Sequence, residues 1–346
     1  MKKIVVIGGV FAGAYAAEHL ENDFSVTLID TKDYFEFTPS VLRTLVEPDH
    51  LKKIQVLHTH YLKKTKLIRA TVKSVTPKYV LYGNKKVPYD YLVICSGSRY
   101  HTPFKEGRVV LSTRAEHLRE YYQKLCPAKD ILIIGGGVVG VELAAEIVTH
   151  CKKGEKHVTI AHSRDQLIQR NSQKAINYTT KFLKKHGVRM VFDGRVVKNK
   201  GKTYITKGGT KIKADLVFLC TGIKSNSEFL QKHFKAQLNE RKQVKVNHFL
   251  QVEGHTNIFA CGDINNSHEE KTAQSAEKQA TTAVENIKRL IKGEKELEEY
   301  QSTKKPMIIS LGKWAGVLEF KSFTLTGLFP GLLKNFVEWK TMRRYR

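Results

Sequence analysis

The sequence lacks the patterns of several protein classes. Its five cysteines are isolated, and no two form a CxxC or CxxxxC pair, so we expect no disulfide framework, zinc site or thiol–disulfide redox pair. No run of eighteen or more apolar residues occurs, so no segment is expected to span a bilayer. No signal or transit pattern precedes the first predicted strand. We therefore expect a cytoplasmic chain, or one held peripherally on a membrane surface.

The charge of the chain is strongly unbalanced. It has 59 Lys and Arg against 33 Asp and Glu, a net charge of +26 over 346 residues. A charge of this sign favours anionic partners such as phosphorylated cofactors, anionic lipid or nucleic acid, although solvated surface lysines explain it equally well. Because the basic residues are spread along the chain and no nucleic-acid-binding module is recognisable, we expect no nucleic-acid partner.

The N-terminal part predicts a β-turn-α-β unit. The strand Lys3–Ile7 is followed by the turn GGVFAG at residues 8–13 and a helix, and the next strand, Ser25–Asp30, ends in an acid. This order places a pyrophosphate at a helix N-terminus and a carboxylate beside the ribose. Val10 stands where the second glycine of GxGxxG belongs, and its β-carbon would crowd a pyrophosphate.

A second unit repeats this scheme about 130 residues later. The strand Asp130–Ile134 leads into GGGVVG at residues 135–140, a complete GxGxxG motif, and this predicts a dinucleotide site. No acid follows the next strand, residues 158–161, where His162 and Arg164 occur instead. These two side chains could tolerate a 2′-phosphate, so we expect NADPH to be accepted, alongside NADH. The alternative is that both face solvent.

The C-terminal residues 307–346 predict a short strand pair and a basic amphipathic helix. Apolar residues occur there at helical spacing, with aromatic and basic residues after them: Leu325, Leu328, Phe329, Leu332, Leu333, Phe336, Trp339 and Tyr345, with Lys334, Lys340, Arg343, Arg344 and Arg346. Such a helix suits a membrane surface with anionic headgroups. The alternative is a helix packed on the body of the protein or on a second subunit, so a homodimer is allowed.

Several segments together resemble the flavoproteins with two dinucleotide-binding domains. They are GGVFAG, Thr221-Gly222, IFACGD at residues 258–263 and KTAQSAEKQA at residues 271–280. Within that class the chain is similar to type II NADH dehydrogenases and to the apoptosis-inducing-factor homologues of the ferroptosis-suppressor group. DYFEFTP at residues 33–39 and WKTMRR at residues 339–344 fit the same group. The similarity covers nearly the whole chain.

The resemblance implies an α/β fold with two Rossmann-like domains, one inserted in the other, and a small C-terminal segment associated with membrane and quinone. The implied limits are 1–105 and 231–295 for the two parts of the FAD-binding domain, 106–230 for the NAD(P)H-binding domain and 296–346 for the C-terminal segment.

The resemblance also implies two sets of cofactor-binding residues and no metal. The set for FAD is Gly8, Gly9, Phe11, Ala12, Gly13, Asp30, Thr38, Pro39, Gly97, Gly262, Asp263 and Ala273. The set for NADH or NADPH is Gly135, Gly137, Val138, Val139, Gly140, Glu142, His162, Arg164 and Gly222. Glu142 matches a glutamate near the nicotinamide; alternatively, it is a first-turn acid favoured by the helix dipole. Gln274 matches the helix start that faces the flavin and borders the quinone site. Lys278 departs from the AQxAxQ pattern of the dehydrogenases at its second glutamine.

The implied activity is that of a FAD-dependent NAD(P)H:quinone oxidoreductase, in which the protein brings the nicotinamide to the flavin and the electrons leave to a quinone. Disulfide reductases keep a cysteine pair after the first unit, and none is present here. No cysteine follows Cys261, which disfavours sulfide:quinone oxidoreductase. Two alternatives stay open: a reductase of an iron–sulfur or rubredoxin-type protein, and a redox-sensing cell-death flavoprotein that binds nucleic acid.

Overall fold

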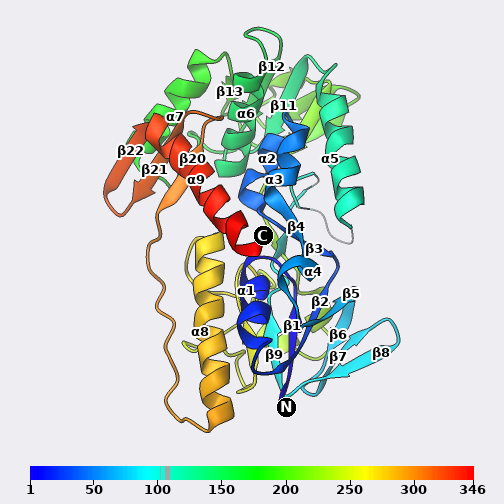
Figure 1. Cartoon of the computed structure of the whole chain (residues 1–346). Coiled ribbons are helices and arrows are strands. Elements are labelled where there is room, and N and C mark those ends of the chain that lie inside the picture. Colours follow the sequence, from blue (N-terminus) through cyan, green and yellow to red (C-terminus); the bar gives the residue numbers. More distant parts are fainter. Residues whose placement is uncertain (102, 106–109) are drawn as a thin grey trace.

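Two parallel sheets, one at each end of the molecule, organise the fold (Figure 1). The computed structural model describes residues 1–101, 103–105 and 110–346. The predicted domain limit between residues 105 and 106 adjoins residues 106–109, which lie outside the described residues. The predicted fold class, α/β with two Rossmann-like units, is confirmed by the strand order of both sheets.

The first sheet has the strand order β19-β9-β1-β2-β5, and all its pairs are parallel. Its strands are β1 (Lys3–Ile7), β2 (Ser25–Asp30), β5 (Lys66–Arg69), β9 (Tyr91–Ile94) and β19 (Ile258–Ala260). Apolar side chains of the strands and of α1 (Phe11–Leu20) and α8 (Ala273–Lys292) form one buried core. Neighbouring strands β9 and β19 are far apart in sequence, because the whole second unit lies between them.

The second sheet has the order β13-β12-β11-β17, again all parallel. Its strands are β11 (Asp130–Ile134), β12 (His157–Ala161), β13 (Arg189–Val191) and β17 (Leu216–Leu219), and its helices are α5 (Leu111–Leu125), α6 (Val138–His150) and α7 (Gln173–Lys185). A two-stranded pairing of β10 (Ser98–Arg99) with β18 (Lys224–Ser225) joins the two chain crossings between the units.

Each unit carries a three-stranded antiparallel sheet, which directly precedes β9 in the first unit and β17 in the second. This shared insertion extends the internal duplication. In the first unit it consists of β6 (Val72–Val75), β7 (Tyr79–Tyr82) and β8 (Lys85–Pro88). In the second it consists of β14 (Val196–Lys200), β15 (Thr203–Thr206) and β16 (Lys211–Lys213). The first unit alone also inserts β3 (Tyr34–Glu36), α2 (Val41–Thr44), α3 (Leu51–Ile54), β4 (Gln55–Leu57) and α4 (His58–Tyr61).

A buried ion pair ties this insertion to α5. Arg114 Nε donates to Glu36 Oε2 at 3.0 Å, and Gln55 Nε2 donates to the same oxygen at 2.7 Å. Burial alone raises the pKa of Glu36, but Arg114 and Lys32 outweigh it, so that the pKa lies below its ordinary value. The carboxylate therefore stays ionised inside the protein.

The C-terminal segment differs from its prediction. It forms three strands rather than two, β20 (Met307–Ser310), β21 (Gly316–Phe320) and β22 (Phe323–Gly327), followed by α9 (Leu328–Tyr345). Leu325 was expected in the helix but pairs with Leu318 in the sheet. Pro330 is accommodated in the first turn of α9, because the first N–H groups of a helix have no intrahelical acceptor and the N–H that proline lacks is not missed there.

Candidate active site

One continuous cleft of about 2970 Å³ connects both units with the C-terminal helix. Its lining includes both glycine turns, the strand ends that follow them, the start of α8 and one side of α9: residues 7–12, 95–100, 134–139, 220–223, 261–263 and 271–277, with Lys334, Val337 and Thr341. Almost every predicted site residue lies on it. Gly13, Gly140 and Arg164 do not.

The two glycine turns are built alike. A β-carbon on Gly13 would lie 1.7 Å from the Gly8 carbonyl oxygen, and one on Gly140 would lie 1.9 Å from that of Gly135. The last glycine of each motif thus packs the helix against its strand and stays out of the cleft. Gly137 has open space where its β-carbon would be. Val10 has nearly the same extended backbone as Gly137, with φ of −97° against −75°, so valine is tolerated there without backbone strain.

The N-termini of α1 and α6 are prepared for anions. Within the described residues neither helix has a side-chain cap, and neither has an acid in its first turn. Their first N–H groups and the positive end of each helix dipole are therefore available at the cleft. Two such termini, each behind a glycine turn, fit the pyrophosphates of FAD and of a nicotinamide dinucleotide.

Equivalent strand ends carry Asp30 and His162. Residues Ile29 and Ala161 occupy matching positions in the two sheets, so Asp30 and His162 follow at the same place. The Gly9 N–H donates to Asp30 Oδ2 at 2.6 Å, and the Gly136 N–H donates to His162 Nδ1 at 3.1 Å. Burial and then Arg164 lower the pKa of His162, so the ring is neutral at pH 7, and because Nδ1 accepts from Gly136, the proton is on Nε2.

Sequence reasoning missed His58, which lies beside Asp30. Its Nε2 is 3.7 Å from Asp30 Oδ2 and has no hydrogen-bond partner among the described residues, while Nδ1 pairs with the Tyr61 hydroxyl at 2.8 Å. Burial alone raises the pKa of Asp30, but the adjacent His58 ring and Lys32 outweigh it, so that the pKa lies below its ordinary value. A carboxylate held in this way is ready to accept hydrogen bonds from ribose hydroxyls.

Asp263 follows β19 and also has partners that the sequence did not reveal. Ser98 Oγ donates to its Oδ2 at 2.6 Å and Lys105 Nζ at 2.9 Å. Burial raises the pKa of Asp263, but Lys105 and Ser98 outweigh it and keep the group ionised. Ser98 directly follows Gly97, which was among the residues expected to bind FAD, whereas Lys105 had no motif to mark it.

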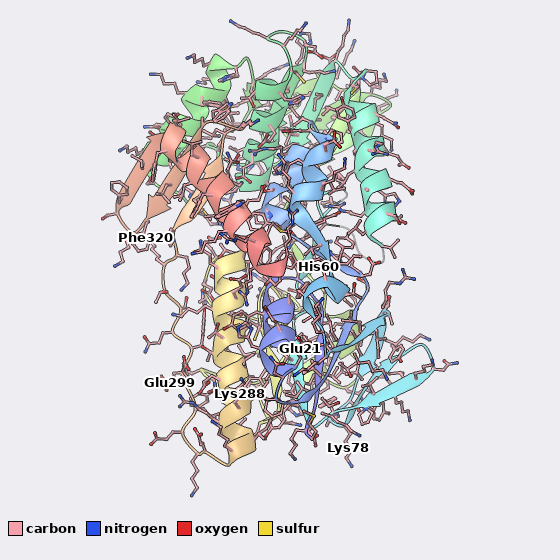
Figure 2. The ribbon with its side chains drawn as sticks, viewed as in Figure 1. Glu21, His60, Lys78, Lys288, Glu299 and Phe320 are labelled. Carbon is pink, nitrogen blue, oxygen red and sulfur yellow. The ribbon has the colours of Figure 1, made fainter. Side chains whose placement is uncertain are left out.

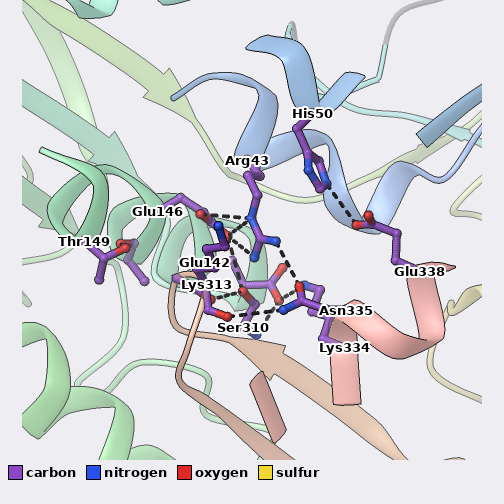
Figure 3. A network of polar contacts seen from close by, with 12 residues as sticks. Arg43, His50, Glu142, Glu146, Thr149, Ser310, Lys313, Lys334, Asn335 and Glu338 are labelled. Carbon is purple, nitrogen blue, oxygen red and sulfur yellow. Dashed lines mark hydrogen bonds and ion pairs between the residues drawn. The ribbon is translucent and has the colours of Figure 1, made fainter. Parts of the chain in front are cut away.

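Glu142 lies at the centre of a polar network that joins α6 to the C-terminal segment (Figure 3). Its Oε1 accepts from the Ser310 N–H at 2.8 Å and from Lys334 Nζ at 2.5 Å. Lys334 was expected to face lipid headgroups, but its side chain is only 13% exposed. That expectation was wrong, because the lysine neutralises a buried carboxylate. Whether Glu142 lies beside the nicotinamide stays a prediction.

Two further contacts hold the same face of α9 (Figure 3). Arg43 pairs with Glu146 at 3.1 Å and donates to Asn335 Oδ1 at 2.9 Å. His50 Nε2 pairs with Glu338 Oε2 at 3.0 Å. The side of α9 that faces the protein thus combines these polar contacts with the buried Met342 and Tyr345.

The start of α8 borders the cleft through Ala273, Gln274 and Glu277. Thr272 caps the helix, accepting from the Ser275 N–H at 3.2 Å. Lys278 is exposed, and the neighbouring Gln279 is buried instead, where its Oε1 accepts from the Gly262 N–H at 2.7 Å. The structural glutamine thus occurs one residue later than the dehydrogenase pattern has it.

The fold and the paired nucleotide sites define a pyridine-nucleotide oxidoreductase. The chain belongs to the pyridine nucleotide-disulphide oxidoreductase family, whose profile matches residues 2–285. It is 33% identical to apoptosis-inducing factor homolog B of Dictyostelium discoideum, over 95% of this chain and 92% of that protein. It is 32% identical to ferroptosis suppressor protein 1 of Homo sapiens, over 99% of this chain and 96% of that protein.

Solved structures agree on the fold. The sulfide:quinone oxidoreductase from Aquifex aeolicus superposes with a TM-score of 0.83 at 20% identity, over 100% of this chain and 92% of that one. NDH2 from Plasmodium falciparum in complex with NADH gives 0.82 at 16% identity, over 99% and 96%. The resemblance inferred from the sequence is confirmed, and FAD with NADH or NADPH as cofactors agrees with the family.

Proposed function

We propose that this chain is a FAD-dependent NAD(P)H:quinone oxidoreductase that works on a membrane surface, on the cytoplasmic side. The proposal rests on the continuous cleft. This cleft runs from two uncapped dinucleotide-binding helix termini to a helix with an exposed apolar face. The domain limits given above, and a homodimer, form part of the same proposal.

The side chains of the cleft bind and orient. The N-termini of α1 and α6 hold the two pyrophosphates, and Asp30 and Asp263 accept hydrogen bonds from sugar hydroxyls. Glu142, fixed by Lys334 and Ser310, orients the nicotinamide. A bound flavin supplies the capacity to take up a hydride and release electrons. The role of the protein is to hold the two ring systems in contact and to admit the acceptor from the side of α8 and α9.

The membrane part of the proposal depends on an exposed apolar surface. Fourteen large apolar side chains are exposed in the described residues, and eight of them lie between residues 314 and 339. These eight, which we call the apolar stripe, are Trp314, Phe320, Phe323, Leu328, Phe329, Leu332, Phe336 and Trp339. Phe320 projects from the edge of the three-stranded sheet (Figure 2). Soluble proteins rarely expose so many apolar side chains together unless the surface binds something.

The orientation of α9 favours lipid as the occupant. Residues on its inner side are the ion-paired Lys334 and Glu338 and the buried Met342 and Tyr345, whereas the five stripe residues of α9 are exposed on its outer side. A helix packed only on the protein would have a polar outer side. Tyr345, expected at a membrane interface, is instead fully buried against Phe35, with ring centroids 4.3 Å apart. That expectation was wrong.

Basic side chains accompany the stripe. Arg343 lies over the Trp339 ring at 5.4 Å, Lys313 over Trp314 at 5.5 Å and Lys321 over Phe320 at 5.5 Å. Tryptophan beside lysine and arginine matches the boundary between acyl chains and anionic headgroups. In the residues that the structure describes, no helix is long and apolar enough to cross a bilayer. These features support attachment from one side.

The test compares quinones in vesicles and in water. The FAD-loaded protein is mixed with vesicles that contain anionic lipid and a long-chain quinone, and turnover with ubiquinone-1 is measured in parallel. The variant carries Phe336→Ser and Trp339→Ser. Each lost ring removes at least about 1.5 kcal/mol of burial, so vesicle affinity should fall roughly a hundredfold.

The matched control is Val197→Ser, an equally exposed apolar residue on β14. The proposal expects the double variant to lose turnover with the long-chain quinone and keep turnover with ubiquinone-1, and the control to keep both. A wild-type protein that does not bind the vesicles would contradict the proposed attachment to a membrane. A protein that reduces a rubredoxin-type acceptor but no quinone would contradict the activity.

A further inference from the structure

The C-terminal end of α9 reaches the first turns of α8 and the helix α1 (Figure 1). Charged side chains from the three helices lie close together there. Arg344 of α9 donates from Nη2 to Glu18 Oε2 at 3.0 Å, and its guanidinium lies 4.8 Å from the centre of the Tyr15 ring. Glu277 of α8 and the buried Tyr345 complete the cluster. Glu18 belongs to no recognised motif, and Glu277 lies in KTAQSAEKQA at a position that the AQxAxQ pattern leaves variable.

The cluster contains two carboxylates and one guanidinium. Arg344 is engaged by Glu18, and no described residue donates a hydrogen bond to the carboxyl group of Glu277. Burial raises the pKa of Glu277, Arg344 opposes that shift, and Glu18 adds to it, so that the pKa lies above its ordinary value. The neighbouring Tyr345 is neutral, because burial raises its pKa above the ordinary value. Glu277 therefore stays protonated to a pH closer to neutral than an ordinary glutamate does.

Glu277 also lies where a substrate in the cleft can meet it. It lines the cleft, and it follows Gln274 by three residues and Ala273 by four, so it shares their face of α8. On α9, Val337 and Thr341 line the same cleft and precede Arg344 at helical spacing. The side chain is only partly buried and can exchange a proton with water.

Reduction of a quinone to a quinol needs two electrons and two protons. NAD(P)H supplies both electrons and one proton equivalent as a hydride, so one more proton must come from the medium. We propose that Glu277 delivers this proton: its O–H bond breaks as an O–H bond forms on the quinol, and the carboxylate then takes a proton from water. This inference rests on the proposed function, and it adds a proton donor on α8 to the acceptor site.

The test separates proton-coupled from proton-free electron transfer in the full-length, FAD-loaded protein. Wild type, Glu277→Gln and Glu277→Asp are reduced with NADH and then mixed with ubiquinone-1 or with ferricyanide, which takes up electrons without protons. The matched control is Glu285→Gln, two turns further along α8 and half exposed. Glu18→Gln tests whether the charge of Glu18 contributes to the raised pKa of Glu277. Infrared spectra across pH record the carbonyl band of a protonated carboxyl group.

The inference expects Glu277→Gln to slow oxidation by ubiquinone-1 roughly tenfold or more while ferricyanide oxidation is kept, and Asp to restore part of the rate. The wild-type quinone rate falls as pH rises through the pKa of Glu277, and the Gln variant loses this dependence. Glu18→Gln moves the wild-type profile to lower pH. The infrared band at neutral pH is absent in Glu277→Gln.

Two results would overturn the inference. One is a Glu277→Gln protein with the wild-type quinone rate and pH profile. The other is equal slowing with quinone and ferricyanide, which marks a structural role through Arg344. A wild-type protein that reduces no quinone refutes the proposed function itself, so the two failures are distinguishable.

Discussion

Replacing Lys334 by methionine should loosen the C-terminal helix. The substitution keeps the length of the side chain but removes the ammonium 2.5 Å from Glu142, and both side chains are about nine-tenths buried. Two unit charges at that distance attract with roughly 7 kcal/mol at an effective dielectric constant of about 20, and desolvation offsets part of this. Breaking a buried pair from one side typically costs about 3–5 kcal/mol, so we expect a loss of that order.

Hydrogen exchange of the α9 amides measures this loss locally, since a two-unit protein need not unfold in a single step. A double-mutant cycle with Glu142→Gln isolates the pair, and Lys340→Met, exposed on the same helix, is the control and should cost less than about 0.5 kcal/mol. The free energy of opening of α9 should fall less in the double variant than the sum of the two single losses, by at least about 1.5 kcal/mol. Additivity within about 0.5 kcal/mol would refute the pairing.

Three further predictions concern the site and its support. Glu142→Ala should retain FAD yet lose most of its flavin reduction by NAD(P)H in stopped-flow spectra; an unchanged rate removes Glu142 from the active site. His162→Asp should lower the ratio of kcat/KM for NADPH to that for NADH by roughly tenfold or more, because a carboxylate repels the 2′-phosphate; an unchanged ratio contradicts the role of His162. Arg114→Met should cost about 3–5 kcal/mol in urea unfolding by leaving Glu36 without its cation. Because the pKa of Glu36 is lowered in the fold from 4.5, its stabilisation is present above about pH 4.5 and is lost as pH falls through the lower value. The Arg114→Met variant should therefore show a weaker loss of stability on acidification, and an equal loss in both proteins would contradict the pairing.

The nucleotide-binding turns were predictable because their signal is local. Gly135, Gly137 and Gly140 must occur together in a few residues between a strand and a helix, Asp30 ends a strand, and Asp263 is three residues beyond one. Close packing in the fold then requires glycine at the last position of each motif, as the 1.7 Å and 1.9 Å approaches of a β-carbon demonstrate.

The C-terminal contacts were not predictable in this way. Lys334 and Glu142 are 192 residues apart, and nothing local distinguishes a lysine that neutralises a buried carboxylate from one that faces headgroups. Helical spacing was extended back to Leu325, which belongs to a strand, because β22 runs directly into α9. Tyrosine is common at membrane interfaces, but the position of Tyr345 is decided by its contacts with two aromatic side chains of the first unit, Phe35 and Tyr61.

The most direct test of the account is an anaerobic redox cycle. The purified protein is examined by visible spectroscopy, then NADPH or NADH is added, and then ubiquinone-1. We predict flavin absorption bands that the nucleotide bleaches and the quinone restores, with the two nucleotides ranked by their bleaching rates. A colourless protein that cannot be reconstituted with FAD would contradict the account and would identify Val10 as a barrier to the pyrophosphate.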